Sequence, residues 1–151
     1  SGPDANRKVD AVIARFAGDA GAPTLPAMMP DIDRCFSAES LREIELKLRK
    51  HPGEWAQKQL AALLKLSPLA MAITLEQLKR CANRSFEDSM TIEYRMSQRC
   101  MQKGHDFFEG VRALLIDKDQ KPQWNPPTIG GVTREMVETH FKPVSNDLFF
   151  D

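Results

Sequence analysis

Apolar side chains recur every three or four residues along most of this 151-residue chain, which is the spacing of one face of an α-helix. No segment shows the sustained alternation of apolar and polar residues that is typical of a strand. The expected helices lie at about residues 4–17, 37–50, 54–66, 68–81, 85–104, 106–116 and 133–141. The pattern therefore predicts an all-α chain of about six to seven helices.

Residues that favour helix N-termini precede most of these segments, because their side-chain oxygens accept hydrogen bonds from backbone N–H groups. The predicted N-caps are Asp4, Ser37, Ser67, Ser85, Asp106 and Thr133. Phe36 is expected to pack on Leu41 as a hydrophobic staple, and Gly104 is expected to end a helix in the left-handed conformation. These signals fix the approximate helix starts independently of the apolar pattern.

One segment, residues 18–30, is rich in Gly, Pro and small residues and has no apolar period. Proline and glycine interrupt regular structure, so this segment is predicted to be an ordered loop or a linker. We therefore divide the chain into residues 1–30, an N-terminal helix with a Pro/Gly-rich linker, and residues 31–151, a helical domain with one core. Because the chain opens with Ser1-Gly2-Pro3 instead of Met, we also expect a cut or processed piece of a longer protein.

The charge balance excludes strong nonspecific attraction to nucleic acid or anionic lipid, because 21 Lys and Arg residues face 21 Asp and Glu residues. The uncharged stretch from Leu66 to Leu75 is too short to cross a bilayer. Three cysteines without a CxxC pair indicate a reducing compartment and not a disulfide framework. The composition thus predicts a soluble protein that has no membrane or nucleic-acid partner.

The residues that could carry chemistry are scattered. His51, His105 and His140 are far apart in the sequence and lack ligand spacing, so no metal site is predicted. His51 and His105 lie near helix termini, where structural roles are expected. Cys81 and Cys100 fall among apolar neighbours and are predicted to be inert thiols. No nucleophile elbow, phosphate-binding Gly-rich loop or HExxH helix is present.

Charged and methionine-rich stretches leave alternatives open. Residues 42–51 indicate a solvated helix face with paired charges four residues apart. Lys118 and Lys121 lie at a helix end beside a Pro-rich segment, where flexible cations can meet a phosphate or simply be solvated. The methionines at helical spacing favour core packing over an adaptable binding groove; they are Met90, Met96 and Met101.

Several motifs together point to a known family. The most specific is GHDFFEGVRALLIDKDQKPQW, from Gly104 to Trp124. It follows EYRMSQRCM at residues 93–101 and precedes VTREMVETHFKP, and earlier motifs are Cys35-Phe36-Ser37, Ser67-Pro68 and Ile73-Thr74-Leu75. In order and spacing, these motifs resemble the C-terminal region of the 3-hydroxyisobutyryl-CoA hydrolase family, within the crotonase superfamily.

The resemblance implies the crotonase fold, in which an N-terminal spiral of strands and helices holds the active site and C-terminal helices pack against it. It implies hydrolysis of the 3-hydroxyisobutyryl-CoA thioester in mitochondrial valine breakdown, with the acyl-CoA as substrate and no required cofactor. This chain corresponds to the helices, so the piece alone is expected to be inactive. Its expected partners are the N-terminal crotonase core of the same protein and, through uncovered apolar faces, a second copy of the chain.

The same resemblance assigns site residues sparingly. No position matches the Gly-rich oxyanion loop or the catalytic acidic residues of the family, so no catalytic residue is carried over. In related crotonases a basic residue just after the EG-containing helix approaches the nucleotide end of CoA, and Lys118 is the nearest equivalent. Glu109 and Arg112 are expected to brace that helix.

Two other functions stay open at this point. An enoyl-CoA hydratase or isomerase shares the scaffold, and a noncatalytic structural or interaction protein, such as one associated with mitochondrial ribosomes, can also derive from it. Fold likeness alone does not decide among these functions.

Overall fold

The computed structural model describes residues 3–19 and 21–150, and these residues contain eight α-helices and no strand. The chain divides into two compact units, one ending at Ile32 and the other beginning at Asp33. The all-α prediction is confirmed. The helix beyond the expected six to seven, Leu25–Phe36, begins inside the segment 18–30 that was predicted to be a loop.

The first unit contains α1 (Pro3–Phe16), which follows the predicted helical stripe. Its apolar side chains are exposed. The helix α2 (Leu25–Phe36) then carries the chain from the first unit into the second. The prediction of a loop through Pro30 is therefore wrong from Leu25 onward. Pro26 lies in the first helical turn, where backbone N–H groups have no helical partner, so only Pro30 removes an intrahelical hydrogen bond.

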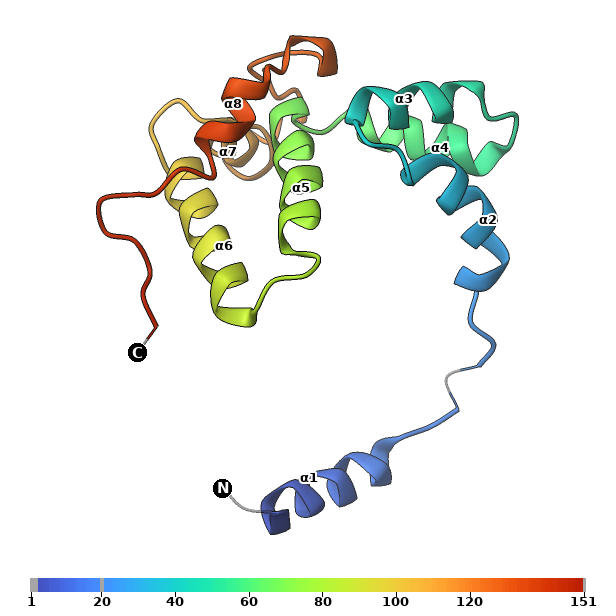
Figure 1. Cartoon of the computed structure of the whole chain (residues 1–151). Coiled ribbons are helices and arrows are strands. Elements are labelled where there is room, and N and C mark those ends of the chain that lie inside the picture. The colour runs from blue at the N-terminus through green and yellow to red at the C-terminus, as the bar shows by residue number, and fades with distance from the viewer. Residues whose placement is uncertain (1–2, 20, 151) are drawn as a thin grey trace. The chain divides into compact units, whose positions relative to one another are not determined.

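The helices α3 (Leu41–Lys50) and α4 (Glu54–Leu63) form a hairpin and lie side by side (Figure 1). Its core contains Leu48 and Cys35, which are fully buried. The predicted cap at Ser37 is wrong, because α2 continues to Phe36 and α3 is capped by Ser40, whose Oγ accepts from the Glu43 N–H. The remaining core residues of the hairpin are Ala38, Ile44, Ala56 and Leu60.

Phe36 is not in the predicted staple position, because the cap of α3 is Ser40 and the residue before it is Glu39. The Phe36 ring makes an edge contact with Trp55 of α4, at 6.3 Å between ring centroids. The end of α2 thus belongs to the core of the hairpin.

A second group of helices contains α5 (Pro68–Cys81), α6 (Phe86–Cys100) and α8 (Arg134–Thr139). The predicted caps of all three are confirmed, since Ser67, Ser85 and Thr133 each accept a backbone N–H three residues ahead. Leu69, Ile73 and Phe141 are the buried residues of this group. Among the predicted core methionines, Met96 packs on this core, whereas Met101 is 56% exposed.

The helix α7 (Asp106–Val111) continues into the π-helix η1 (Arg112–Ile116), so the predicted helix at residues 106–116 is present. Its cap differs from the prediction, because His105 and not Asp106 accepts the first free N–H, from Phe107. Gly104 has a φ of 87°, the left-handed conformation that was predicted for it. The short 3-10 helix η2 (Ile129–Gly131) follows the Pro-rich segment.

In the described part of the chain, no single helix is long and apolar enough to span a bilayer. Only α4 and α5 taken together pass that test, and they are bent by 110°.

Candidate functional site

The loop after η1 is built around the guanidinium of Arg112. Arg112 donates to both carboxylate oxygens of Glu109 at 2.9 and 2.8 Å, and to Asp117 and Asp119 at 2.7 Å each. The bonds from Arg112, together with a 2.7 Å bond from the Gln123 N–H, lower the pKa of Glu109 to about 2. One cation thus holds three carboxylates and folds residues 117–123 back onto α7. The predicted bracing role of Glu109 and Arg112 matches this geometry.

Two residues of this loop have backbone conformations that side chains disfavour. Lys118 has a φ of 57° and Gln120 a φ of 58°, both in the left-handed region. Each such conformation lowers the stability of the fold by about 1–3 kcal/mol, and it persists only where surrounding contacts hold it. Here the Arg112 bonds supply those contacts, together with the hydrogen bond from the Asp117 N–H to the Arg112 carbonyl at 2.8 Å. Short π-helices such as η1 and strained residues both occur often at functional sites.

Lys118 is the one residue for which the sequence predicted a ligand contact. Its side chain is exposed and, among the described residues, takes no part in the ion pairs that hold the loop. The two aspartates that flank it are both bound to Arg112, so their charge is already partly neutralised. The geometry can therefore present the Lys118 ammonium to an anion such as a phosphate.

Trp124 and Asn125, which follow the loop, are held by hydrogen bonds near the starts of α5 and α7. Asp106 accepts from the Ser67 hydroxyl at 2.5 Å and from the Asn125 N–H at 2.9 Å, and it is 6% exposed. Trp124 donates through Nε1 to the Lys65 carbonyl at 3.0 Å. These bonds bring residues far apart in sequence together and fix the orientation of the whole loop.

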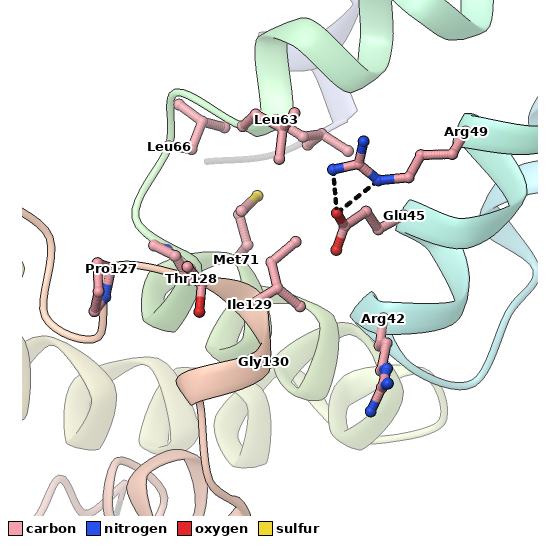
Figure 2. A pocket seen from close by; sticks show the side chains of 12 residues that line it. Arg42, Glu45, Arg49, Leu63, Leu66, Met71, Pro127, Thr128, Ile129 and Gly130 are labelled. Atoms are coloured by element: carbon pink, nitrogen blue, oxygen red, sulfur yellow. Dashed lines mark hydrogen bonds and ion pairs between the residues drawn. The ribbon is translucent and has the colours of Figure 1, made fainter.

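An open pocket of about 400 Å³ lies between α3 and the segment before η2 (Figure 2). One wall is polar and carries Arg42, Glu45 and Arg49; the other includes Met71 and Ile129. Figure 2 shows Arg49 bonded to Glu45, at 2.6 and 2.9 Å. The predicted charge pairing on this helix face is therefore confirmed, and sequence reasoning missed only that the face borders a pocket. The Arg49–Glu45 pair is neutral, which leaves Arg42 as one net positive charge among the residues that line the pocket.

The histidines that are separated in sequence occupy different environments. His51 caps α3 and accepts the Gly53 N–H through Nδ1 at 3.0 Å. His105 and His140 come together, with Nε2 atoms 3.0 Å apart, and Cys100 lies beside them. No metal site was predicted, because the histidines are far apart in the sequence. The fold nevertheless brings Cys100, His105 and His140 close together.

The cysteines give no sign of nucleophilic catalysis. All three are thiols, and burial raises the pKa of Cys100. Desolvation and the neighbouring His140 lower the pKa of His105. A thiol with a raised pKa is mostly protonated at neutral pH and is a poor nucleophile.

Comparison with known proteins gives consistent matches. The family model described as enoyl-CoA hydratase/isomerase matches residues 2–141. The mitochondrial 3-hydroxyisobutyryl-CoA hydrolase of Gallus gallus is 49% identical over 119 residues, which are 79% of this chain and 31% of that protein. The Homo sapiens protein of the same name is 46% identical over 123 residues, 81% of this chain and 32% of that protein. The chain thus spans about a third of the length of these relatives.

Solved structures are similar over almost the whole chain. A carnitinyl-CoA dehydratase from Mycobacterium thermoresistibile matches with a TM-score of 0.84 and 35% identity, covering 95% of this chain and 41% of that one. An enoyl-CoA hydratase from Rhodobacter sphaeroides matches with a TM-score of 0.80 and 34% identity, covering 96% and 45%.

Proposed function

Because the chain belongs to the enoyl-CoA hydratase/isomerase family, we propose that it is the C-terminal helical part of a 3-hydroxyisobutyryl-CoA hydrolase. The observation that carries this proposal is the identity of 49% and 46% with two proteins of that name, over about four fifths of the chain. The names of these relatives also support a mitochondrial location for the whole protein.

In this proposal the helices serve as a cover and an assembly element for a catalytic core that other residues of the protein form. Thioester hydrolysis needs a carboxylate or another base to activate the nucleophile, and N–H groups to hold the oxyanion. Glu109, whose pKa is lowered to about 2, is bound to Arg112 and serves the loop instead.

One apolar surface available for the catalytic core is formed by η1 and the start of α7. Leu115 and Ile116 are 67% and 70% exposed, and Leu114 and Phe107 are about half exposed. Contiguous exposed apolar side chains mark an interaction surface. We assign this face to the N-terminal core of the same protein. Without that core, the face is expected to drive self-association.

Self-association is directly measurable. Light scattering on the 151-residue chain over a wide concentration range should show a mass that rises above that of the monomer. Replacing Leu115 and Ile116 by Ser should lower the apparent association constant. A constant monomer mass at all concentrations would contradict this part of the proposal.

The Lys118 loop supports a contact with the nucleotide end of CoA. Its ammonium is exposed and unpaired within the loop, while its backbone is held in place through Arg112. A cation fixed in this way is suited to a phosphate, and an exposed contact of this kind is worth about 1 kcal/mol or less. In calorimetric titration of the chain with CoA, Lys118→Ala is therefore expected to weaken binding by up to about fivefold.

The titration needs two comparisons. Lys103→Ala, at an exposed lysine outside the loop, should leave CoA binding unchanged. Titration with 3′-dephospho-CoA should reduce the effect of Lys118→Ala if the 3′-phosphate is the group contacted. Equal weakening by the Lys103 and Lys118 substitutions would remove the assignment of Lys118.

A second function remains in the same family. The two solved structures carry the names carnitinyl-CoA dehydratase and enoyl-CoA hydratase, and each is over 30% identical across nearly the whole chain. Their similarity favours hydration or dehydration of an acyl-CoA as the alternative chemistry. A noncatalytic scaffold is the third outcome.

One assay separates these functions. The complete protein that contains this chain is mixed with 3-hydroxyisobutyryl-CoA, and the CoA thiol released is followed with a disulfide reagent. We expect repeated turnovers, well beyond the stoichiometric signal of the three cysteines of this chain. If the protein instead removes water from the 3-hydroxyacyl group, enoyl-CoA absorbance should appear without thiol release, and this result would identify a hydratase acting in reverse. Neither signal would favour a noncatalytic scaffold. The 151-residue chain alone should be inactive in both assays.

A further inference from the structure

Three helix ends meet at a cluster of metal-ligating side chains. Cys100 is the last residue of α6, His105 is the N-cap of α7 and His140 is the C-cap of α8. One donor atom from each residue lies within 4.8 Å of the other two. His140 is buried, whereas Cys100 and His105 are partly exposed.

The hydrogen bonds around the two rings determine where their protons lie. The Phe107 N–H can only donate, so His105 Nδ1 accepts it at 3.1 Å and the neutral ring carries its proton on Nε2. That proton points to His140 Nε2, 3.0 Å away. His140 then carries its proton on Nδ1 and donates it to the Met136 carbonyl at 2.8 Å. His140 Nε2 is thus a lone-pair donor aimed into the cluster.

This arrangement is close to that of a metal-bound histidine. Such histidines usually donate their other ring N–H to a carbonyl or carboxylate, which fixes the ring. The bond from His140 Nδ1 to Met136 provides that orientation. In a tetrahedral zinc site two nitrogen ligands lie about 3.3 Å apart and a nitrogen and a sulfur about 3.5 Å apart. The ligand atoms here therefore need only small side-chain movements.

One member of the cluster, His140, also borders an open hollow. His140 lines an open hollow of about 350 Å³ together with Leu69, Met136 and Thr133. Asp106 is the nearest carboxylate along the chain, but its two oxygens accept from Ser67 and Asn125. The candidate ligand set is therefore one thiolate and two imidazoles, which suits zinc and similar divalent cations better than magnesium or calcium.

We propose that Cys100, His105 and His140 form a zinc site with a fourth position open to water. Binding requires Cys100 to release its thiol proton to solvent. It also requires the proton of His105 to move from Nε2 to Nδ1, which breaks the capping bond with the Phe107 N–H. The loss of that bond is offset by the bonds from the metal to one residue at the end of each of α6, α7 and α8. This site is separate from the Lys118 loop and does not depend on the proposed hydrolase activity.

The other reading of the cluster is a neutral histidine pair that only connects α7 and α8. Cobalt(II) distinguishes the two, because a thiolate ligand gives a charge-transfer band and tetrahedral cobalt gives strong visible bands. Titration of the 151-residue chain, without any affinity tag, should give both bands with saturation at one equivalent. Zinc should then displace the cobalt and abolish the spectrum.

Two variants test the assignment of ligands. Cys100→Ser should abolish the charge-transfer band, and His140→Gln should weaken cobalt binding at least about tenfold. Cys81→Ser, at a partly exposed thiol outside the cluster, should leave the spectrum unchanged. Circular dichroism checks that each variant is folded.

A measurement on the unaltered chain covers the case in which the variants do not fold. Zinc should slow alkylation of Cys100 by iodoacetamide by tenfold or more, read by mass spectrometry, while Cys81 reacts at the same rate with and without zinc. The proposal is overturned if no charge-transfer band appears, if Cys100→Ser retains it, or if zinc does not protect Cys100.

Discussion

The α3–α4 hairpin and the α5–α8 group, in which we include α7 and η1 with the second group of helices, are stabilised in different ways. In the hairpin, Cys35, Leu48 and Ala56 are all 0% exposed, and the buried interior is mostly apolar. In the α5–α8 group only three apolar residues form the buried cluster, and α6 and α8 bury no residue fully. Buried polar residues make up much of the remainder; they are Ser67, Asp106 and His140.

The second group depends on directional bonds between distant residues. Arg80 joins α5 to Glu138 of α8 at 2.7 Å, and Arg95 of α6 makes a two-pronged contact with Asp147 near the end of the chain. Apolar packing stabilises the hairpin. The second group, in contrast, keeps exposed apolar side chains on α7 and η1 while polar bonds fix its geometry. This is what is expected of a layer that covers another surface and positions a loop.

The largest loss of stability is expected from a substitution in the apolar core of the hairpin. Leu48→Ala removes a fully buried side chain, and it is expected to lower the free energy of unfolding by about 3 kcal/mol, since a cavity remains. Urea denaturation followed by circular dichroism measures the change. Leu46→Ala, at a side chain that is 46% exposed on the same helix, should have a much smaller effect. Equal losses would mean that the hairpin core is not close-packed.

Asp106→Ala should remove the buried polar bonds of the α5–α8 group. This substitution leaves the Ser67 hydroxyl and the Asn125 N–H without their acceptor, and we expect a loss of about 2 kcal/mol in the same denaturation experiment. Asp106→Asn should recover part of it, because the amide can still accept from Asn125 and donate to Ser67. If Asp106→Ala were neutral, polar bonds would not be what holds the α5–α8 group.

The two groups also differ in how far the sequence alone predicts them. The caps of α5, α6 and α8 were predicted because each depends on a residue and a backbone N–H only three positions apart. The helix α2 was missed because its first half is rich in Pro and shows no apolar period, although Pro26 lies in a turn that tolerates it. Local signals were thus sufficient for these three caps but not for the start of α2.

The polar bonds and the clusters they form could not be predicted in this way. Ser67 and Asp106 are 39 residues apart, and His105 and His140 are 35 apart. No local pattern specifies such pairs, because the intervening helices must first pack. The resemblance to a family pointed to Lys118 but not to its left-handed backbone, which depends on the carboxylates gathered by Arg112.

A smaller effect is expected at the junction of the two groups. Trp124→Phe removes the hydrogen bond from Nε1 to the Lys65 carbonyl, between α4 and α5, together with the outer ring atoms that lie near Gly110. The free energy of unfolding should fall by about 1 kcal/mol. Denaturation curves of the two proteins measure the difference. An unchanged stability would show that water replaces the lost donor and that this bond does not join the groups.

The smallest effect should be found at the Lys118 loop and should depend on pH. Arg112 and the Gln123 N–H lower the pKa of Glu109 from its usual 4.5 to about 2 in the folded chain. A carboxylate with a lowered pKa stabilises the fold above its unfolded pKa, and this stabilisation is lost as the pH falls through the folded value. Glu109→Gln should therefore lower the melting temperature at pH 7, and its difference from the unaltered chain should shrink between about pH 4.5 and 2.

Trp124→Phe provides the control for this pH series, because it removes no titratable group. The decrease in melting temperature that it causes should be the same across this pH range. Asp119 is bound to the same guanidinium and its pKa is also lowered, so Asp119→Asn should repeat the behaviour of Glu109→Gln. A deficit for Glu109→Gln that stays constant down to pH 2 would show that the carboxylate acts through packing and not through charge. The geometry of the loop would then depend on apolar contacts, as the hairpin does, and the contrast between the two groups would not hold at this position.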